Sequence, residues 1–286
     1  MSNYRIFTDS ACDIPSDKLA ALGVASASLT FRFSDDNKEY YNNEMSPVEF
    51  YDRMRKGGVA KTSAVNSTAF ETEFEDYLER GEDILYIGFS TGLSTTCNSA
   101  VSAMKSLSAK YPERKLLAVD TRSASLGFGL LLYLTVKKKE QGATIEEAYE
   151  YANSLIPSLC HWFTVDDLVY LKRGGRVSAT TAFVGNMLGI KPVLHMDDAG
   201  HLINMSKVRG RRASIAALAD KYGTLCKDKS APVFISHGDC FGDAELLKSM
   251  IEERGGKVEM IDFVGPVIGA HAGPGVLALF FIGKER

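Results

Sequence analysis

The amino-acid sequence predicts an α/β fold with two domains. In its first half, three strand-like runs, at 4–8, 84–89 and 115–120, are each followed by a polar turn and a helical pattern. This alternation indicates a parallel sheet with helices packed on both of its faces. In the second half, two further strand-like runs, at 191–196 and 202–207, flank a short loop that contains a glycine. A hairpin of this kind among helices predicts an α+β domain with a mixed sheet.

The pattern changes close to Pro157, which ends a helical segment because proline cannot continue a helix. We therefore expect an N-terminal parallel-sheet α/β/α domain over residues 1–158 and a C-terminal α+β domain over residues 159–286. A β-prone insert over residues 26–43 lies between the first two strands of the N-terminal domain.

Two capping boxes mark helix starts in the first domain, Ser46 with Glu49 and Thr144 with Glu147. An apolar run at 125–136 predicts a buried helix that ends in three lysines. This run is far shorter than the roughly 20 residues that a membrane span requires. No stable membrane insertion is therefore expected.

Composition and charge argue against several classes of protein. Hydrophobic residues make up 45% and charged residues 24% of the chain, which is typical of a globular protein with a substantial core. A net charge of −3 gives no electrostatic reason to expect a nucleic-acid partner, although local basic clusters are possible. The cysteines are odd in number and lack a C-x-x-C pair, and no signal peptide precedes the first strand. These features predict reduced thiols, a cytoplasmic location and no metal site.

The segment GFSTG at 88–92 matches the G-x-S-x-G pattern that holds the nucleophile of α/β-hydrolases between a strand and a helix. A serine hydrolase that uses Ser90 is therefore one hypothesis. It would need an acidic residue and then a histidine later in the chain, and both types occur there. No glycine-rich oxyanion loop lies between the early strands, however, and the further hydroxyls at 94–96 have no role in such a site.

Hydroxyl side chains follow three of the predicted strands, at 8–10, 90–96 and 120–123. Ligands of parallel sheets lie beyond the carboxyl ends of the strands, where helix N-termini attract anions. The alternative is that these residues only cap helices. A row of neutral hydroxyls without a cation would bind a single negative charge without reacting with it. The sequence thus also allows a carrier of a small anion.

Two glycine-containing motifs in the second half add further candidates. Residues 170–176 combine two glycines with three cations, and they could simply form the C-terminal cap of a helix. Residues 268–275 place His271 in a turn of small residues before the last strand. The glycines there permit close approach of a ligand, to which His271 would donate a hydrogen bond.

Taken in order, these motifs resemble the DegV family of bacterial fatty-acid-binding proteins, the lipid-carrying subunits of fatty acid kinase. The resemblance extends from the first strand to the last. The segments that carry it are TDSACDIP at 8–15, KTS at 61–63, STGLSTT at 90–96, DTRSASLG at 120–127, LKRGGR at 171–176, KP at 191–192 and IGAHAGPG at 268–275.

The resemblance implies a long-chain fatty acid in a buried tunnel, with its carboxylate held at the junction of two α/β domains. The residues it assigns to the carboxylate are Thr62 or its neighbour Ser63, Ser94 with Thr95 beside it, and His271. No cofactor other than the bound lipid is implied.

The resemblance also implies that the protein is not itself an enzyme. An ATP-binding kinase subunit would phosphorylate the bound carboxylate to an acyl phosphate for phospholipid synthesis. The chain has no G-x-x-x-x-G-K-[ST] motif for binding ATP, in agreement with ATP binding by a separate subunit. We expect Arg173, Arg176 and Arg209 to face the partner or the phosphate, although they could equally form a solvated basic surface.

Overall fold

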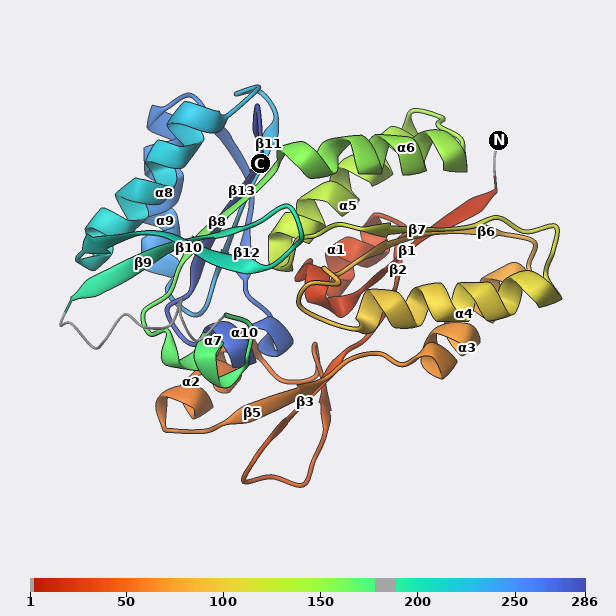
Figure 1. Ribbon diagram of the computed structural model, residues 1–286, viewed down its shortest axis with the longest axis horizontal. Coiled ribbons are helices and arrows are strands. Elements are labelled where there is room, and N and C mark those ends of the chain that lie inside the picture. Colours follow the sequence, from red (N-terminus) through yellow and green to blue (C-terminus); the bar gives the residue numbers. More distant parts are fainter. Residues whose placement is uncertain (1–2, 178–188) are drawn as a thin grey trace.

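The computed structural model of the protein describes residues 3–177 and 189–286 (Figure 1). Its first sheet has four parallel strands in the order β2-β1-β6-β7. These are β1 (Tyr4–Asp9), β2 (Ala25–Ala27), β6 (Asp83–Gly88) and β7 (Leu116–Asp120). The predicted parallel sheet and its three main strands are confirmed.

Helices cover both faces of this sheet, with α3 and α4 on one face and α5 and α6 on the other (Figure 1). Side chains from β1 and α3 form an aromatic core in which the rings of Phe7 and Phe74 pack edge to face, 4.9 Å apart. The helices of this part of the chain are α1 (Ser16–Ala21), α3 (Ser67–Leu78), α4 (Thr96–Lys110), α5 (Ser125–Glu140) and α6 (Ile145–Leu155).

The second sheet is mixed and has six strands in the order β10-β9-β8-β13-β11-β12. Its neighbouring strands run antiparallel except for β11 and β12, which are parallel. The strands are β8 (Leu159–Thr164), β9 (Ile190–Met196), β10 (Leu202–Arg209), β11 (Pro232–His237), β12 (Lys257–Phe263) and β13 (Leu277–Ile282). The predicted hairpin, formed by β9 and β10, and the predicted mixed sheet are both confirmed.

The two faces of the second sheet have different neighbours. One face packs against α8 (Arg211–Leu225) and α9 (Phe241–Glu253) in a separate hydrophobic core. The other face packs against α5, whose partner α6 lies on β6 and β7 of the first sheet. The apolar run at 125–136, predicted as a buried helix, lies in α5. It is buried because α5 packs between α6 and the second sheet. The exact domain boundary at residues 158 and 159 stays a prediction.

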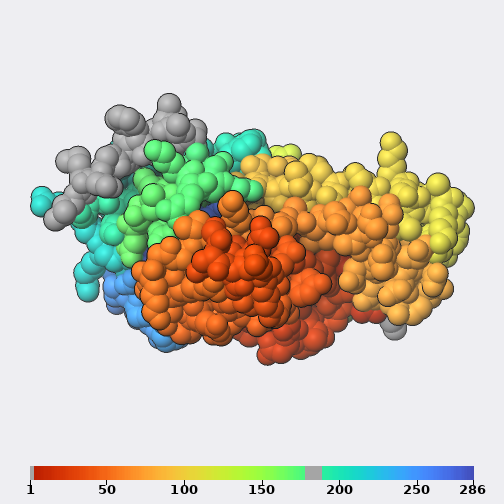
Figure 2. Space-filling view, turned by 90° about the horizontal axis from the view of Figure 1, so that it is seen from below, coloured from red at the N-terminus to blue at the C-terminus, as the bar shows by residue number. Residues whose placement is uncertain are grey.

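The β-prone insert differs from the prediction at both ends. Ala25–Ala27 pairs with β1 at the edge of the parallel sheet, so this part belongs to the main sheet. A small antiparallel sheet follows, in the order β4-β3-β5. Its strands are β3 (Thr30–Phe33), β4 (Tyr40–Tyr41) and β5 (Ala60–Ser63), with α2 (Pro47–Arg55) between the last two. The prediction missed β5 because its partner strand lies some distance earlier in the chain. These segments, coloured orange, cover the middle of the face in Figure 2.

The two predicted capping boxes have different outcomes. Thr144 and Glu147 form the reciprocal pair of hydrogen bonds at the start of α6. Ser46 lies at the N-cap of α2 but makes no side-chain capping bond, so this box is wrong. Pro47 follows it, with a preset φ and no N–H that needs a partner.

Two short helices bring distant segments to one place. They are α7 (Val169–Arg173) and α10 (Pro266–Ala272), which pack against each other, and α10 also contacts α2, β3 and β5. His271, predicted in a turn, lies instead in the last turn of α10, and Gly273 ends that helix with a φ of 80°. In the part of the chain that the structure describes, no helix is both long and apolar enough to cross a membrane.

Candidate functional site

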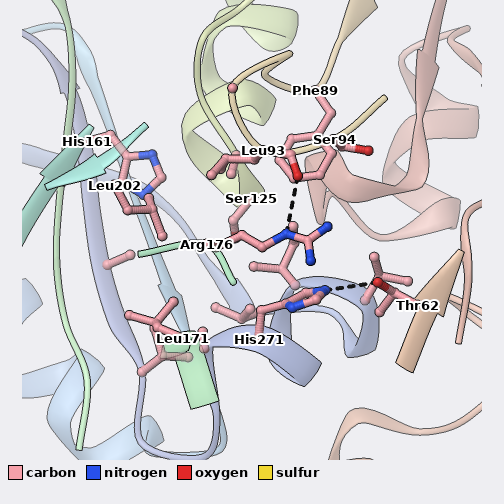
Figure 3. Close-up of a pocket in the computed structure, with 18 of the residues that line it drawn as sticks. Thr62, Phe89, Leu93, Ser94, Ser125, His161, Leu171, Arg176, Leu202 and His271 are labelled. Carbon is pink, nitrogen blue, oxygen red and sulfur yellow. Dashed lines mark hydrogen bonds between the residues drawn. The ribbon is translucent and has the colours of Figure 1, made fainter. Parts of the chain in front are cut away.

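A cavity of about 490 Å³ lies where the small sheet, the loop after β6, α7, α10 and the second sheet meet. This volume is within the range of pockets that enclose small organic ligands, roughly 300 to 1,000 Å³. Its walls are polar on one side and mostly apolar elsewhere (Figure 3). The polar side chains come from segments that are far apart in the sequence.

Thr62 and His271 form the centre of the polar side. Thr62 lies on β5 and His271 on α10, and Thr62 Oγ1 is 2.9 Å from His271 Nε2 (Figure 3). The packing of α10 against β5 brings them together. Both side chains line the cavity, as the family resemblance implies.

The imidazole of His271 is confined on its other edge by Gly174, at the end of α7. A Cβ atom at position 174 would lie 2.2 Å from His271 Nδ1, so a glycine is needed for this close approach. Burial, together with a smaller effect of the positive charge of Arg176, lowers the pKa of His271 to about 4. His271 is therefore neutral near pH 7 and can donate one hydrogen bond, not two.

The loop between β6 and α4 contributes Ser94 and Thr95 to the cavity. Ser94 Oγ lies 2.9 Å from Thr96 Oγ1 and accepts a hydrogen bond from the Thr96 amide at 3.2 Å. Thr95, at the start of α4, is exposed and makes no side-chain capping bond. The N-terminus of a helix of this length favours a negative charge nearby.

Arg176, which was expected to face the partner or the phosphate, also lines the cavity. Its half-buried guanidinium donates from Nε to the carbonyl of Leu93 at 3.3 Å and from Nη1 to the carbonyl of Gly174 at 2.5 Å. The expectation of neutral hydroxyls without a cation is therefore wrong. Arg176 follows a pair of glycines, and its chain position alone could not reveal that it turns inward instead of toward solvent.

The apolar wall is formed by the inner face of the second sheet and by α10. Phe163 on β8 pairs in register with Ala278 on β13, and both line the cavity. The buried side chains of Phe89, Leu171 and Val267 also contribute to the lining. Together they provide a surface suited to an alkyl chain.

Three polar side chains interrupt this apolar wall, namely Ser125, His161 and Ser236. His161 Nδ1 lies 3.1 Å from Ser123 Oγ, and burial holds the pKa of His161 well below its usual value. None of the three was predicted as a site residue. No spacing signal could have found Ser236 or His161, because the residues on either side of each do not line the cavity.

The other predicted site residues lie elsewhere. Ser63 is exposed and does not line the cavity, because successive side chains of a strand point to opposite faces. Arg173 and Arg209 are also exposed and outside the lining. Among residues 3–177 and 189–286, no three His, Cys, Asp or Glu side chains are grouped as metal ligands.

Ser90, the candidate nucleophile, is fully buried and outside the cavity lining. Its hydroxyl donates to the carbonyl of Gly200 at 2.9 Å and accepts from the amide of Gly92 at 3.2 Å. No histidine of the described residues is hydrogen-bonded to it. The arrangement lacks the base that a serine nucleophile requires, so GFSTG serves to pack this loop against the β9–β10 turn.

The hydroxyls at the other two strand ends are structural. Thr8 donates to the carbonyl of Ile87 at 2.9 Å, and Thr121 donates to that of Gly88 at 2.8 Å. Of the three predicted anion-binding turns, the one after β6 reaches the cavity with its hydroxyls.

Comparison with known proteins agrees with the geometry. Residues 3–284 match the family model described as "Uncharacterised protein, DegV family". The chain belongs to the DegV family. A DegV domain-containing protein of Clostridium perfringens is 43% identical over 291 residues, which cover 100% of this chain and 99% of the relative.

Solved structures of DegV proteins have the same fold. A DegV lipid binding protein from Thermotoga maritima is 31% identical, with a TM-score of 0.85 and 100% of both chains covered. A DegV family protein from Thermus thermophilus, whose structure is described as showing fatty acid binding, is 26% identical. It has a TM-score of 0.88, with 98% of this chain and 99% of the other covered.

Proposed function

We propose that this DegV protein binds a long-chain fatty acid in the cavity. The observation that carries this proposal is the division of the cavity into a compact polar side and an apolar remainder. The carboxylate lies at the polar side, against Thr62, Ser94 and His271, with Thr95 at the rim. The acyl chain extends along the apolar wall. The lipid and fatty acid binding described for the Thermotoga and Thermus relatives supports this assignment.

Arg176 gives the polar side the charge that a carboxylate needs. Hydrogen bonds to a charged group stabilise by roughly 1.5–3 kcal/mol each, more than bonds between neutral groups. The neutral His271 donates one hydrogen bond and Arg176 supplies the positive charge. Binding energy from the tail adds to this, at about 0.8 kcal/mol for each buried methylene.

We further propose that the protein presents the carboxylate to an ATP-binding kinase subunit, which forms the acyl phosphate. Thr95 is exposed beside the polar side of the cavity, so the carboxylate lies near the protein surface. Arg173 and Arg209 are exposed cations that can attract this subunit and the phosphates of its bound ATP. In a reconstituted reaction, Arg173→Ala should slow acyl phosphate formation and leave lipid binding unchanged. Equal rates for Arg173→Ala, Arg209→Ala and the parent protein would contradict this role.

A comparison of a fatty acid with its methyl ester tests the binding proposal. Native mass spectrometry of the purified protein should first show an adduct of fatty-acid mass. In a displacement titration, the parent protein should bind palmitic acid about ten- to a hundredfold more tightly than methyl palmitate, because the ester has no charge to place beside Arg176. Equal affinity for acid and ester would exclude a carboxylate site.

The same titration separates a lipid site from a site for a small anion. Acetate carries the same carboxylate without the tail, so it should not displace palmitate at millimolar concentration. Displacement by acetate would favour the small-anion alternative.

A further inference from the structure

Two serine side chains lie in the cavity wall in positions where an alkyl chain alone would favour apolar residues. Ser125 begins α5, and Ser236 lies on β11. Both are buried, both line the cavity, and their Oγ atoms are 3.0 Å apart. Neither serves the polar side formed by Thr62, Ser94 and His271.

The register of the second sheet places Ser236 on the face that lies under the tail. Ser236 pairs with Ala278, and Ala278 pairs with Phe163 on the next strand. Since side chains directly opposite each other share a face, these three form one row across the sheet. On its other side Ser236 pairs with Asp262 on β12, so it is the hydroxyl that lies between a carboxylate and the apolar members of the row.

A buried carboxyl group holds Ser125 in place, and Ser125 in turn bonds to Ser236. Ser125 Oγ donates to Asp13 Oδ2 at 2.5 Å, and Asp13 itself does not line the cavity. Ser125 has a φ of 53° and Asp13 a φ of 54°, in the left-handed region that residues other than glycine seldom adopt. Strained backbone of this kind persists where the surrounding contacts enforce it, and it is concentrated at functional sites.

The protonation state of Asp13 sets the direction of the hydrogen bonds that run from Asp13 through Ser125 to Ser236. It therefore determines whether Ser236 can donate or only accept a hydrogen bond from a ligand. If Asp13 is ionised, both serine hydrogens point toward it and Ser236 presents only acceptor lone pairs to the cavity. If Asp13 is protonated on Oδ2, the bonds reverse and Ser236 can donate. Burial raises the pKa of Asp13 to about 8, and the negative charges of Asp262 and Asp9 act in the same direction, whereas the hydrogen bond from Ser125 opposes the shift. A ligand hydroxyl, which both donates and accepts, fits either arrangement, whereas a ketone fits only one.

We infer that the cavity selects a fatty acid that carries a hydroxyl group along its chain, and that this hydroxyl bonds to Ser125 and Ser236. The inference rests on the fatty-acid binding proposed above. The carboxylate fixes one end of the ligand at Thr62 and His271, so one position of the hydroxyl along the chain should fit best. An unsubstituted chain offers no polar atom to either hydroxyl, so Ser236 keeps only its hydrogen bond with Ser125.

The test uses stearic acid and a series of monohydroxystearic acids that differ only in the carbon that bears the hydroxyl. The readout is the ratio of the Kd of stearic acid to that of each hydroxy acid. In the parent protein this ratio should reach about two- to tenfold for one position and be near or below one for the others. In Ser236→Ala the preference should disappear, and in Ser125→Ala it should fall.

Ser214→Ala is the matched control, because Ser214 is equally buried but bonds to the Arg211 carbonyl in the other core. It should keep the parent ratio. The inference is overturned if stearic acid binds more tightly than every hydroxy acid. It is also overturned if Ser236→Ala lowers only the melting temperature and keeps the ratio, since the hydroxyls would then only join the two sheets. Failure of all the acids to bind would overturn the proposed function as well, whereas tight binding without a preference overturns this inference alone.

Discussion

Thr62 and His271 are separated by 209 positions in the chain, yet Thr62 Oγ1 and His271 Nε2 lie 2.9 Å apart. The contact joins a strand of the small sheet to a helix that immediately precedes the last strand of the second sheet. Neither side chain is at a strand end of the parallel sheet, where the sequence predicted an anion site. The polar side of the cavity therefore depends on how the small sheet docks against α10.

Replacing Thr62 with valine should weaken fatty-acid binding about tenfold, because valine keeps the shape of the side chain but removes the hydroxyl that faces the carboxylate. A displacement titration with palmitic acid measures this. Ser63→Ala is the control, since Ser63 points away from the cavity, and its affinity should equal that of the parent protein. A larger loss in Ser63→Ala than in Thr62→Val would mean that the wrong face of β5 has been assigned.

Gly174→Ala should reduce acid binding without removing any polar group from the cavity. The backbone of Gly174 is in the right-handed helical region, which alanine adopts readily, but the new Cβ would displace the His271 ring. Gly242→Ala is a matched control, because a Cβ there meets no atom within 4 Å. We expect at least a several-fold loss for Gly174→Ala and none for Gly242→Ala. Parent-like binding by Gly174→Ala would show that the position of His271 is unimportant.

Arg176→Met should raise the pKa of His271, because the Arg176 charge is one of the two causes that lower it. An NMR titration of the His271 ring protons measures the shift directly. Burial remains in the variant, so the pKa should stay below the usual histidine value of about 6.5. Arg173→Met, which removes an exposed cation, should leave this pKa unchanged. If the pKa of His271 is the same in Arg176→Met as in the parent, the guanidinium of Arg176 lies farther from His271 in solution than in this structure.

The buried carboxyl group of Asp13 predicts a stability that falls as the pH rises. Its pKa is about 8 in the folded protein, mainly because of burial, against 3.8 for the unfolded chain. Between these values the folded state holds a proton that the unfolded state has lost, so this contribution is complete below about pH 4 and is lost as the pH rises through 8. Asp13→Asn should remove this dependence. The difference in free energy of unfolding between Asp13→Asn and the parent should shift in favour of the variant by on the order of 3 kcal/mol between pH 5 and pH 7.5.

Urea unfolding at the two pH values measures the effect of Asp13→Asn. Asp17→Asn is the control, because Asp17 is exposed in the first turn of α1. The same relative stability of Asp13→Asn at both pH values would mean that Asp13 is ionised throughout.

Ser90 should not react with a fluorophosphonate probe, because its hydroxyl is committed to the carbonyl of Gly200 and has no base. Ser90→Ala should instead destabilise the protein by about 1–3 kcal/mol, since it leaves a buried carbonyl without its partner. Labelling by mass spectrometry and unfolding by urea test the two statements. Stoichiometric labelling that disappears in Ser90→Ala would restore the hydrolase hypothesis.

Local patterns in the sequence were sufficient for much of the fold. The strands β1, β6 and β7 are short apolar runs bounded by polar turns, and the β9–β10 hairpin has a glycine in its loop, so each is specified by neighbours in the chain. The start of α6 at Thr144 is likewise local, since a capping box involves residues three apart. Hydrophobic periodicity and turn chemistry act over a few residues, and one sequence displays them fully.

The functional site was only partly accessible in this way. The family resemblance drew attention to Thr62, Ser94, Thr95 and His271, and all four line the cavity. It could not choose between Thr62 and Ser63, because that choice depends on which face of β5 turns inward. The pairing of β5 with β3 decides it, and that pairing joins segments about 30 residues apart.

What the tertiary structure alone decided is the direction in which single side chains point. Arg176 turns into the cavity because its guanidinium meets the carbonyls of Leu93 and Gly174 there, and Ser90 turns away from it toward Gly200. Ser236 faces the cavity because β11 pairs with β13 in one particular register. The sequence determined which elements form and which residue types are available to the site. Only the packing of distant segments, which carries no local signal, determined which of those residues share one cavity.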